Sequence, residues 1–172
     1  MVWRYVEPEK ATALEGAHST VGKCSSSAAR HKKARRNGNE VYGAYGWNLN
    51  LDEMKWLADW LMARGVNLFW PHAFYYSVRD YRAYERPPDL GRHNLWWEHY
   101  HIFANYTNRI FWLLTDSEQV CDIAILAHHN RLPWEPAKVL FQNQWDFNYL
   151  EDRLLPKTTI ENGQIKIGKS SY

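Results

Sequence analysis

The sequence predicts an α/β fold built on parallel strands, and two observations support this fold class. Residues 40–70 have the pattern strand, helix, strand within about thirty residues, the length of one βαβ crossover. A second apolar run, VCDIAIL, begins near residue 120 and predicts the start of another such unit. Two parallel strands and three helices bury too little to complete an α/β domain. We therefore interpret the chain as a fragment that ends within a second domain.

The residues before this crossover are predicted to form a loop over positions 1–20 and a helix over positions 21–36, which ends before NGN. The run EVYGAYG, which begins at Glu40, predicts a short strand. Its glycines indicate a bend or a close approach of the backbone.

The helix that follows is the most clearly marked element of the chain. Asn50 and Glu53 have the spacing of a capping box, in which the Asn side chain accepts a hydrogen bond from a backbone N–H of the first turn. Gly65 is expected to end the helix in the left-handed conformation. The apolar residues of its predicted buried face are Met54, Leu57, Ala58 and Leu61.

The remaining elements are predicted from apolar runs and turn signals. VNLFW predicts a second strand that is apolar on both faces, and a long loop, SVRDYRAYERPPDLGRHN, separates it from a helix over residues 96–114. Residues 135–155 are expected to supply a helix and surface segments, and IENGQIKIG a hairpin with its turn at NG. The apolar stripe of the 96–114 helix is Trp96, Tyr100, Phe103, Tyr106, Ile110, Leu113 and Leu114.

The aromatic content is the unusual feature of the composition. Aromatic side chains make up 16% of the chain and include ten Trp, more than core packing normally requires. Aromatic rings stack on sugar rings and on nucleobases, so the excess fits a ligand platform as well as it fits a Trp-rich core. The net charge of +2 points to no class of partner.

The termini and cysteines leave the compartment open. The N-terminus, MVWRYVEPEK, lacks the apolar region of a signal peptide, and no run of about eighteen apolar residues predicts a membrane span. Cys24 and Cys121 permit one disulfide but do not require it.

A basic run, KCSSSAARHKKARR, is either a nucleic-acid patch or the solvated face of a helix. We predict the solvated face, with every basic side chain in solvent and no nucleic-acid partner. The basic residues of the run are Lys23, Arg30, Lys32, Lys33, Arg35 and Arg36.

Glu40 is the candidate catalytic residue. Cleavage of a glycosidic bond uses two carboxyl groups, which in barrel enzymes lie at the carboxyl ends of strands. Glu40 stands in a strand that leads into a loop rich in glycine and aromatic residues, although a surface ion pair explains it equally well. His72 ends the next strand at the equivalent level, as a donor to sugar hydroxyls or as a structural histidine. The candidate substrate-binding residues are His72, Tyr42, Tyr45, Trp47 and Trp70.

Other catalytic arrangements have less support. His128 and His129 are adjacent, and a strand would point them to opposite faces, so we do not expect them to share a metal ion. No spacing matches a zinc motif, and GxSxG, GxGxxG and GxxxxGK are absent from the sequence.

The block NEVYGAYGWNLNLDEMKWLADWLMARGVNLFWPHAFYYS, followed by RPPDLGRHNLWWEHY, resembles the α-L-rhamnosidase-like glycoside hydrolases of family 106 type. The resemblance extends upstream through VGKCSSSAARH and downstream through VCDIAIL, and so covers most of the chain. RHKKARRNG departs from the pattern, because relatives carry an aromatic–glycine step before the basic run.

This resemblance implies that residues 1–115 are the last two or three βα units of a (β/α)8 TIM barrel, and that residues 116–172 begin a flavodoxin-like accessory α/β domain. It also implies an inverting reaction in which Glu40 is the general base, with the catalytic acid on an earlier strand that the chain lacks. Family members use calcium near the site, but no ligand residue is assigned here. The chain alone is expected to be inactive without the missing N-terminal part of the barrel, and to expose an apolar sheet edge.

Two alternatives remain open. A retaining, β-galactosidase-like hydrolase would use Glu40 as its nucleophile, and a non-catalytic carbohydrate-binding module would use the aromatic side chains alone. The expected partner in each case is an oligo- or polysaccharide. The parent enzyme is expected in a bacterium, whether secreted, periplasmic or cytoplasmic.

Overall fold

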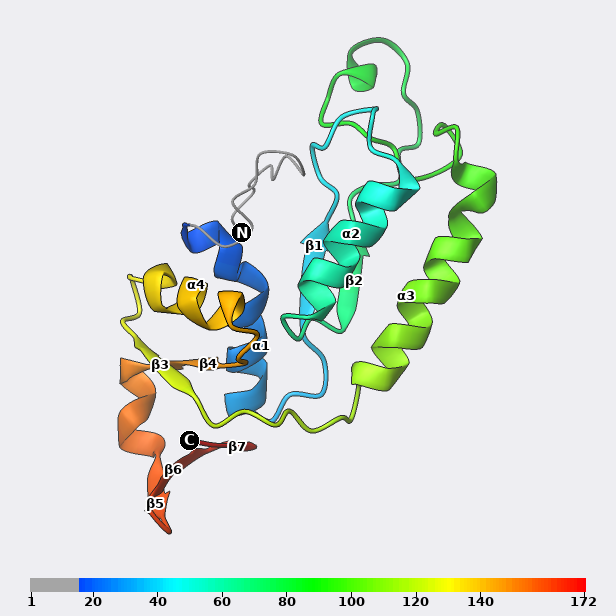
Figure 1. Cartoon of the computed structure of the whole chain (residues 1–172). Coiled ribbons are helices and arrows are strands. Elements are labelled where there is room, and N and C mark those ends of the chain that lie inside the picture. The colour runs from blue at the N-terminus through cyan, green and yellow to red at the C-terminus, as the bar shows by residue number, and fades with distance from the viewer. Residues whose placement is uncertain (1–15) are drawn as a thin grey trace.

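The computed structural model describes residues 16–172, and its fold is mixed α/β. Helices accompany three small sheets, two of them with two parallel strands and one with three antiparallel strands (Figure 1). The described residues form no closed barrel. The α/β fold class is thus confirmed, whereas the partial barrel stays a prediction. The loop predicted over residues 1–20 falls mostly outside the described residues, and Ala17–Thr20 form a 3₁₀ turn, η1.

The first parallel sheet is the predicted strand–helix–strand unit. It pairs β1 (Gly38–Val41) with β2 (Leu68–Pro71), and α2 (Leu51–Met62) connects the two strands. β1 begins and ends earlier than the predicted strand EVYGAYG. It ends early because the backbone at Tyr42 and Ala44 has φ values of 70° and 64°, which turn the chain out of the extended conformation.

The local signals that define α2 are confirmed. The side chain of Asn50 accepts a hydrogen bond from the Glu53 N–H at 2.9 Å, and the Glu53 carboxylate accepts one from the Asn50 N–H at 3.1 Å, which completes the capping box. Gly65, after the helix, has a φ of 91°. The predicted apolar face of α2 is buried in a first core that also contains Tyr42 and Phe103.

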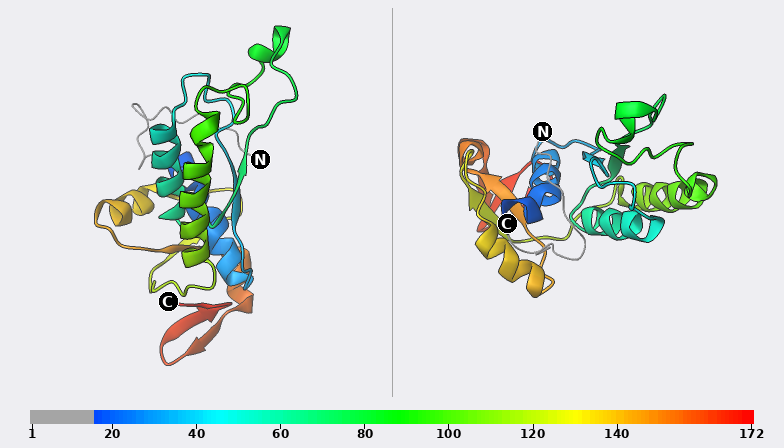
Figure 2. Two further views of the ribbon diagram at one scale, coloured as in Figure 1. Left: turned by 90° about the vertical axis from the view of Figure 1, so that its right-hand side faces the viewer. Right: turned by 90° about the horizontal axis from the view of Figure 1, so that it is seen from above.

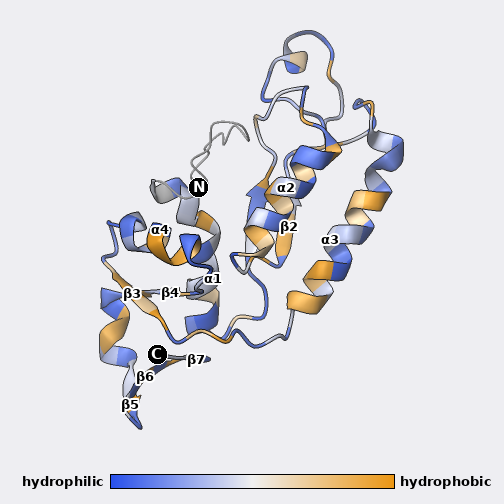
Figure 3. Ribbon diagram, viewed as in Figure 1, coloured by the Kyte–Doolittle hydropathy of each residue, from blue (hydrophilic) through white to orange (hydrophobic). Residues whose placement is uncertain are grey.

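A long helix, α3 (Tyr100–Leu114), lies beside α2 on the same side of the β1–β2 sheet (Figure 2). A 3₁₀ turn, η3 (Trp97–His99), precedes it. Most of the predicted stripe packs against the first core, but Leu113 is 62% exposed and its neighbour Trp112 is 79% exposed. Apolar and polar residues are interspersed along α3 (Figure 3). Part of the surface of α3 is therefore apolar and uncovered.

The second parallel sheet pairs β3 (Ala124–Ala127) with β4 (Asn148–Glu151), and α4 (Trp134–Gln142) connects them. The strand in VCDIAIL and the helix after it are confirmed. The sequence pattern does not predict β4, because it falls among the surface segments expected there, yet its first three residues are buried. A distant helix, α1 (Val21–His31), packs on this strand and buries it.

The chain ends in an antiparallel sheet. A 3₁₀ turn, η4 (Asp152–Lys157), leads into β5 (Thr159–Glu161), β6 (Gln164–Ile167) and β7 (Ser170–Ser171). The predicted hairpin between β5 and β6 is confirmed, and the Asn-Gly pair at its turn has φ values of 53° and 79°.

The first helix, α1 (Val21–His31), lies between the two parallel units (Figure 1). It ends before the predicted position 36. It makes hydrogen bonds to both units: Ser26 Oγ donates to the Arg64 carbonyl at 2.7 Å in the first unit, and Ser27 Oγ accepts from the Tyr149 N–H at 2.9 Å on β4. The same helix is therefore hydrogen-bonded to both parallel units.

Lys23 is buried, which corrects the expectation that the whole basic run lies in solvent. Its side chain is 1% exposed, pairs with Asp146 and lies 5.4 Å from the ring centroid of Phe147. Burial lowers the pKa of Lys23, and the Asp146 carboxylate opposes that shift. The carboxylate makes burial of this ammonium tolerable. Four other basic residues of the run are exposed, namely Lys32, Lys33, Arg35 and Arg36.

The domain boundary expected after residue 115 stays a prediction. α1, in the first predicted domain, packs on β4 in the second. Among residues 16–172, no helix combines the length and the apolar character that crossing a bilayer requires.

Ser27→Ala should lower the free energy of unfolding by about 1–3 kcal/mol, because the buried N–H of Tyr149 loses its acceptor. Chemical denaturation of the variant and the wild type measures this difference. Ser117→Ala is the matched control, because the exposed Ser117 hydroxyl bonds to a carbonyl within its own turn, and its effect should stay within about 0.5 kcal/mol. Equal losses in both variants would contradict the role of Ser27.

Candidate functional site

Glu40 and His72 meet at the carboxyl ends of β1 and β2. Glu40 lies opposite Trp70 in the parallel register, and the His72 N–H donates to the Val41 carbonyl at 2.8 Å, which extends the pairing. His72 follows Trp70 by two positions, so its side chain returns to the face that carries Glu40. Nδ1 of His72 is 2.8 Å from Oε1 of Glu40, and the two side chains are 21% and 26% exposed. The structure thus brings these two sequence candidates together.

Trp70 lies on the same face of the sheet. Its indole ring covers Gly38, where a Cβ would come within 2.2 Å of ring atoms, and Trp70 is 57% exposed. Any side chain at position 38 would displace the ring. An exposed Trp beside a carboxylate offers a flat surface on which a sugar ring can stack. On the other face of the sheet, Val41 and Phe69 pack into the first core.

The other three aromatic candidates lie in the turn after β1 and have different surroundings. Tyr42 is 1% exposed in the first core, and its hydroxyl donates to the Met54 carbonyl at 3.2 Å. Tyr45 is half-buried against the same core. Trp47 is 38% exposed, and its indole N–H donates to the Ala83 carbonyl at 2.7 Å. Tyr42 is therefore a core residue, whereas Trp47 ties the loop after β1 to the loop after β2.

Asp89 organises the long loop between β2 and α3, and the sequence candidates do not include it. The residue is fully buried, and its carboxylate accepts hydrogen bonds from the Tyr75 N–H at 2.8 Å, the His93 N–H at 3.0 Å and Nδ1 of His93 at 2.8 Å. Burial alone would raise the pKa of Asp89, but these donors hold it below its ordinary value of 3.8. In the sequence, the one feature that could mark Asp89 as a candidate is its place directly after the Pro-Pro pair.

The loops after β1 and β2 form a joint rim at this end of the sheet. The Gly46 N–H donates to the Pro87 carbonyl at 2.8 Å, and the 3₁₀ turn η2 (Asp80–Ala83) carries the acceptor for Trp47. Several rings of the second loop are exposed to solvent, so the rim adds aromatic surface that the sequence candidates do not include. The most exposed of them are Tyr76, Tyr81 and Tyr84.

Calcium does not fit the side chains around Glu40. Ca²⁺ takes about six to eight oxygen ligands, several of them from carboxylates. Within residues 16–172, the one group of three Asp, Glu, His or Cys side chains close enough to share an ion is elsewhere, at His128, His129 and Asp152. Oε1 of Glu40 is bonded to His72. These side chains therefore do not make up a calcium site.

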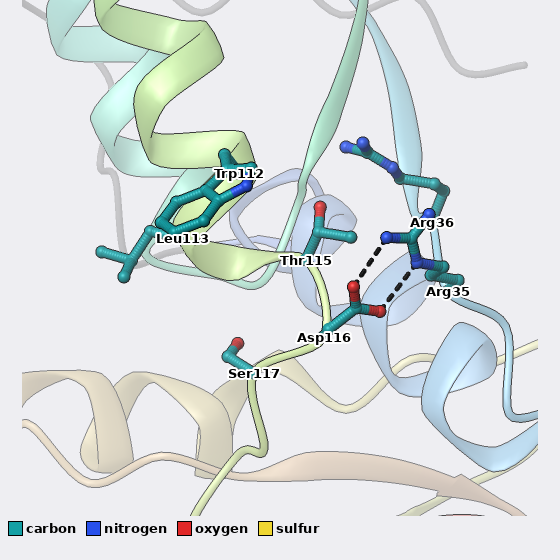
Figure 4. Close-up of a pocket in the computed structure, with 7 residues that line it drawn as sticks. All are labelled: Arg35, Arg36, Trp112, Leu113, Thr115, Asp116 and Ser117. Atoms are coloured by element: carbon teal, nitrogen blue, oxygen red, sulfur yellow. Dashed lines mark hydrogen bonds and ion pairs between the residues drawn. The ribbon is translucent and has the colours of Figure 1, made fainter.

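A pocket of about 340 Å³ at the amino end of β1 is a weaker candidate. The Arg35 guanidinium donates two hydrogen bonds to the Asp116 carboxylate, at 2.7 and 2.6 Å, and Trp112 lies across from this pair (Figure 4). The two charged side chains are 67% and 61% exposed, so solvent screens their attraction. Ligands of parallel α/β sheets bind at the carboxyl ends of the strands, which is the opposite end.

Comparison of the chain with protein-family models, with curated proteins and with solved structures finds no match.

Asp89→Asn should lower the free energy of unfolding by about 1–3 kcal/mol at neutral pH. The amide nitrogen cannot accept the hydrogen bonds that a carboxylate oxygen accepts from His93. Denaturant titration measures the change. Asp80→Asn, at an exposed position of η2, is the control and should change the free energy by less than about 0.5 kcal/mol. An unchanged stability of Asp89→Asn would show that the loop does not depend on this carboxylate.

The same contacts predict a pH dependence. The pKa of Asp89 in the folded chain lies below its ordinary value of 3.8, so the ionised carboxylate stabilises the fold fully above that value. This contribution is lost as the pH falls through the folded-state pKa. The difference in unfolding free energy between the wild type and Asp89→Asn should therefore shrink between neutral and acid pH, which a series of denaturation curves measures. A difference that stays constant over this range would contradict the assignment.

Proposed function

We propose that residues 1–115 are the C-terminal part of the (β/α)8 catalytic barrel of an α-L-rhamnosidase-like glycoside hydrolase, with Glu40 as the general base of an inverting reaction. One observation carries the proposal. The Glu40 carboxylate, bonded to His72 at 2.8 Å, lies at the carboxyl end of a parallel sheet beside the exposed Trp70. Barrel enzymes of this class carry their catalytic residues at this end of the strands.

The arrangement of β1, α2, β2 and α3 supports an incomplete barrel. These elements form two consecutive βα units whose helices cover the same face of the sheet (Figure 2). In a TIM barrel the helices form the outer ring, and the other face of the strands points to the interior. That other face carries Glu40 and Trp70. Within the described residues β1 and β2 pair only with each other, so each leaves an edge for a further strand.

The uncovered surface of α3 supports the same proposal. Ile102 is 61% exposed, Leu113 62% and Trp112 79%, so three large apolar side chains of α3 face solvent. Exposed apolar patches on soluble proteins mark surfaces that pack against something else. The proposed partner of this surface and of the open sheet edges is the missing N-terminal part of the barrel.

In the proposed reaction Glu40 takes a proton from the water that attacks the anomeric carbon. His72 donates from Nδ1 to Oε1 of Glu40, which orients the carboxylate, and Oε2 accepts the proton of the water. The sugar stacks on Trp70. The catalytic acid protonates the leaving group from the opposite side, about 6.5–9.5 Å from Glu40, and belongs to the missing part of the barrel.

Residues 116–172 fit the start of an accessory α/β domain. β3, α4 and β4 form a second βαβ unit with its own core, which includes Ile125, Ala137 and Phe147. Flavodoxin-like sheets are assembled from such units. The flavodoxin-like assignment remains part of this proposal.

The exposed rings at the rim favour one alternative, a carbohydrate-binding module without catalysis. Such a module needs stacking surfaces but no general base. A retaining hydrolase with Glu40 as nucleophile is the other alternative, and it differs in the configuration of the product.

Glu40→Gln tests the proposal in a protein that joins this chain to the N-terminal part of the barrel. Loss of the general base should lower kcat on aryl α-L-rhamnosides by about 10²–10⁴-fold while substrate binding is retained. NMR of the wild-type product reports its anomeric configuration. Glu98→Gln is the control, because the Glu98 side chain is 79% exposed and lies outside the site, and its kcat should equal that of the wild type.

The possible outcomes distinguish the three hypotheses, namely an inverting hydrolase, a retaining hydrolase and a binding module. Inversion in the wild type together with loss of turnover in Glu40→Gln supports the general base. Retention of configuration makes Glu40 a nucleophile instead. An unchanged kcat in Glu40→Gln removes Glu40 from the reaction, and sugar binding without any turnover in the wild type favours the binding module.

A further inference from the structure

We propose that His128, His129 and Asp152 form a binding site for a divalent transition-metal ion of the Zn²⁺ class. One ligand atom from each side chain lies within 4.8 Å of the other two. The site belongs to the second βαβ unit and uses no residue of the proposed hydrolase site.

The topology of β3 and β4 brings these side chains together. His128 follows Ala127, the last residue of β3, and Asp152 follows Glu151, the last residue of β4. Ala127 and Glu151 are opposite each other in the parallel register. The cluster therefore stands at the carboxyl end of a parallel pair, where α/β sheets bind their ligands.

The two histidines lie side by side, which corrects the expectation that they point to opposite faces. β3 ends at Ala127, and the chain then turns, with the Arg131 N–H donating to the His128 carbonyl at 3.0 Å. Strand alternation does not apply within a turn. The two imidazole centroids are 4.1 Å apart. Consecutive positions can thus supply two nitrogen ligands to one ion.

A neighbouring amide selects the nitrogen of His128 that faces the ion. Oδ1 of Asn130 accepts a hydrogen bond from Nδ1 of His128, which leaves the lone pair on Nε2. The Asn130 N–H also lies 3.5 Å from Nδ1, but that distance is at the outer limit of a hydrogen bond, so the contact with Oδ1 decides the tautomer. Metal-bound histidines are commonly oriented by an outer partner of this kind.

The spacing of the ligand atoms fits one ion. Nε2 of His128 is 3.5 Å from Oδ2 of Asp152. Ligands of a tetrahedral zinc ion are about 3.3 Å apart, given metal–ligand distances of about 2.0–2.1 Å. The side chains of both histidines are exposed, so they can rotate about their side-chain bonds. Such a rotation can bring the ligand nitrogen of His129 to the spacing that one ion requires.

The donor set indicates the class of metal. Two imidazoles and one carboxylate suit Zn²⁺ and neighbouring first-row ions, whereas calcium and magnesium take oxygen ligands. This site therefore differs in its ligands from the calcium site that the family resemblance implies near Glu40.

A cavity of about 420 Å³ adjoins the three ligands. Both histidines line it, together with Tyr149 and Glu151 of β4 and Cys24 of α1. Three protein ligands leave one tetrahedral position for another group, as in catalytic rather than structural zinc sites. Water or an anionic group from the cavity would complete the coordination.

Titration of the full chain with Zn²⁺, in competition with a chromophoric chelator, tests this proposal. We expect one Zn²⁺ per chain. His128→Gln, His129→Gln and Asp152→Asn should each weaken Zn²⁺ binding by about 10–100-fold or more. Loss of an outer partner already costs about that much, and each of these variants removes a ligand. His101→Gln is the matched control, because this exposed histidine of α3 lies outside the cluster, and its affinity should equal that of the wild type.

Asn130→Ala distinguishes a built site from a chance pair of exposed histidines. It keeps all three ligands but removes the partner of Nδ1, and should weaken Zn²⁺ binding by about 10–100-fold. Far-UV circular dichroism of each variant verifies the fold. No Zn²⁺ binding by the wild-type chain, or wild-type affinity in the three ligand variants, would overturn the proposal. None of these measurements depends on glycosidase activity.

Discussion

The polar contacts of α1 are the constraint on which the rest of this structure depends. The helix offers Ser26 to the first parallel unit and Ser27 to the second, through hydrogen bonds of 2.7 and 2.9 Å. Its carboxyl end abuts the antiparallel sheet at Gly168, where a Cβ would come within 2.4 Å of a helix carbonyl. An apolar helix face can slide over a sheet, but buried donors and acceptors are satisfied in one position only. α1 therefore sets where the three sheets lie relative to one another.

The position of α1 also affects the Glu40–His72 pair, because backbone contacts connect the helix to β1 and β2. α1 is hydrogen-bonded to the turn between α2 and β2 through Ser26. Asn37 and Asn67, which precede β1 and β2, form two hydrogen bonds with each other. The Asn37 N–H donates to Oδ1 of Asn67 at 2.7 Å, and the Asn67 N–H donates to the Asn37 carbonyl at 3.0 Å. These bonds set the parallel register of β1 and β2. A slip of one residue would turn His72 to the opposite face and separate it from Glu40.

Prediction from the sequence succeeds where the signal is local. The capping box of α2, its apolar face and the Asn-Gly turn are each defined by neighbouring residues, and each is found. β4 and the burial of Lys23 depend on packing between segments more than a hundred residues apart, so local patterns do not reveal them. Within the site, aligned strand ends predict that Glu40 and His72 meet. Tyr42 goes to the core because its φ of 70° breaks the alternation of the strand.

Both parallel units place a histidine and a carboxylate at the carboxyl ends of their strands, and the neighbours of the imidazole decide what each pair can do. In the first unit Nδ1 of His72 contacts Glu40 directly at 2.8 Å, and this hydrogen bond orients the carboxylate that we propose as the general base. In the second unit Asn130 occupies Nδ1 of His128, and the lone pair on Nε2 faces Asp152 at 3.5 Å. In the neutral ring, a lone pair on Nε2 and the carboxylate oxygen can both coordinate a cation that lies between them. The same strand topology therefore fits both proposals, proton transfer in the first unit and metal binding in the second.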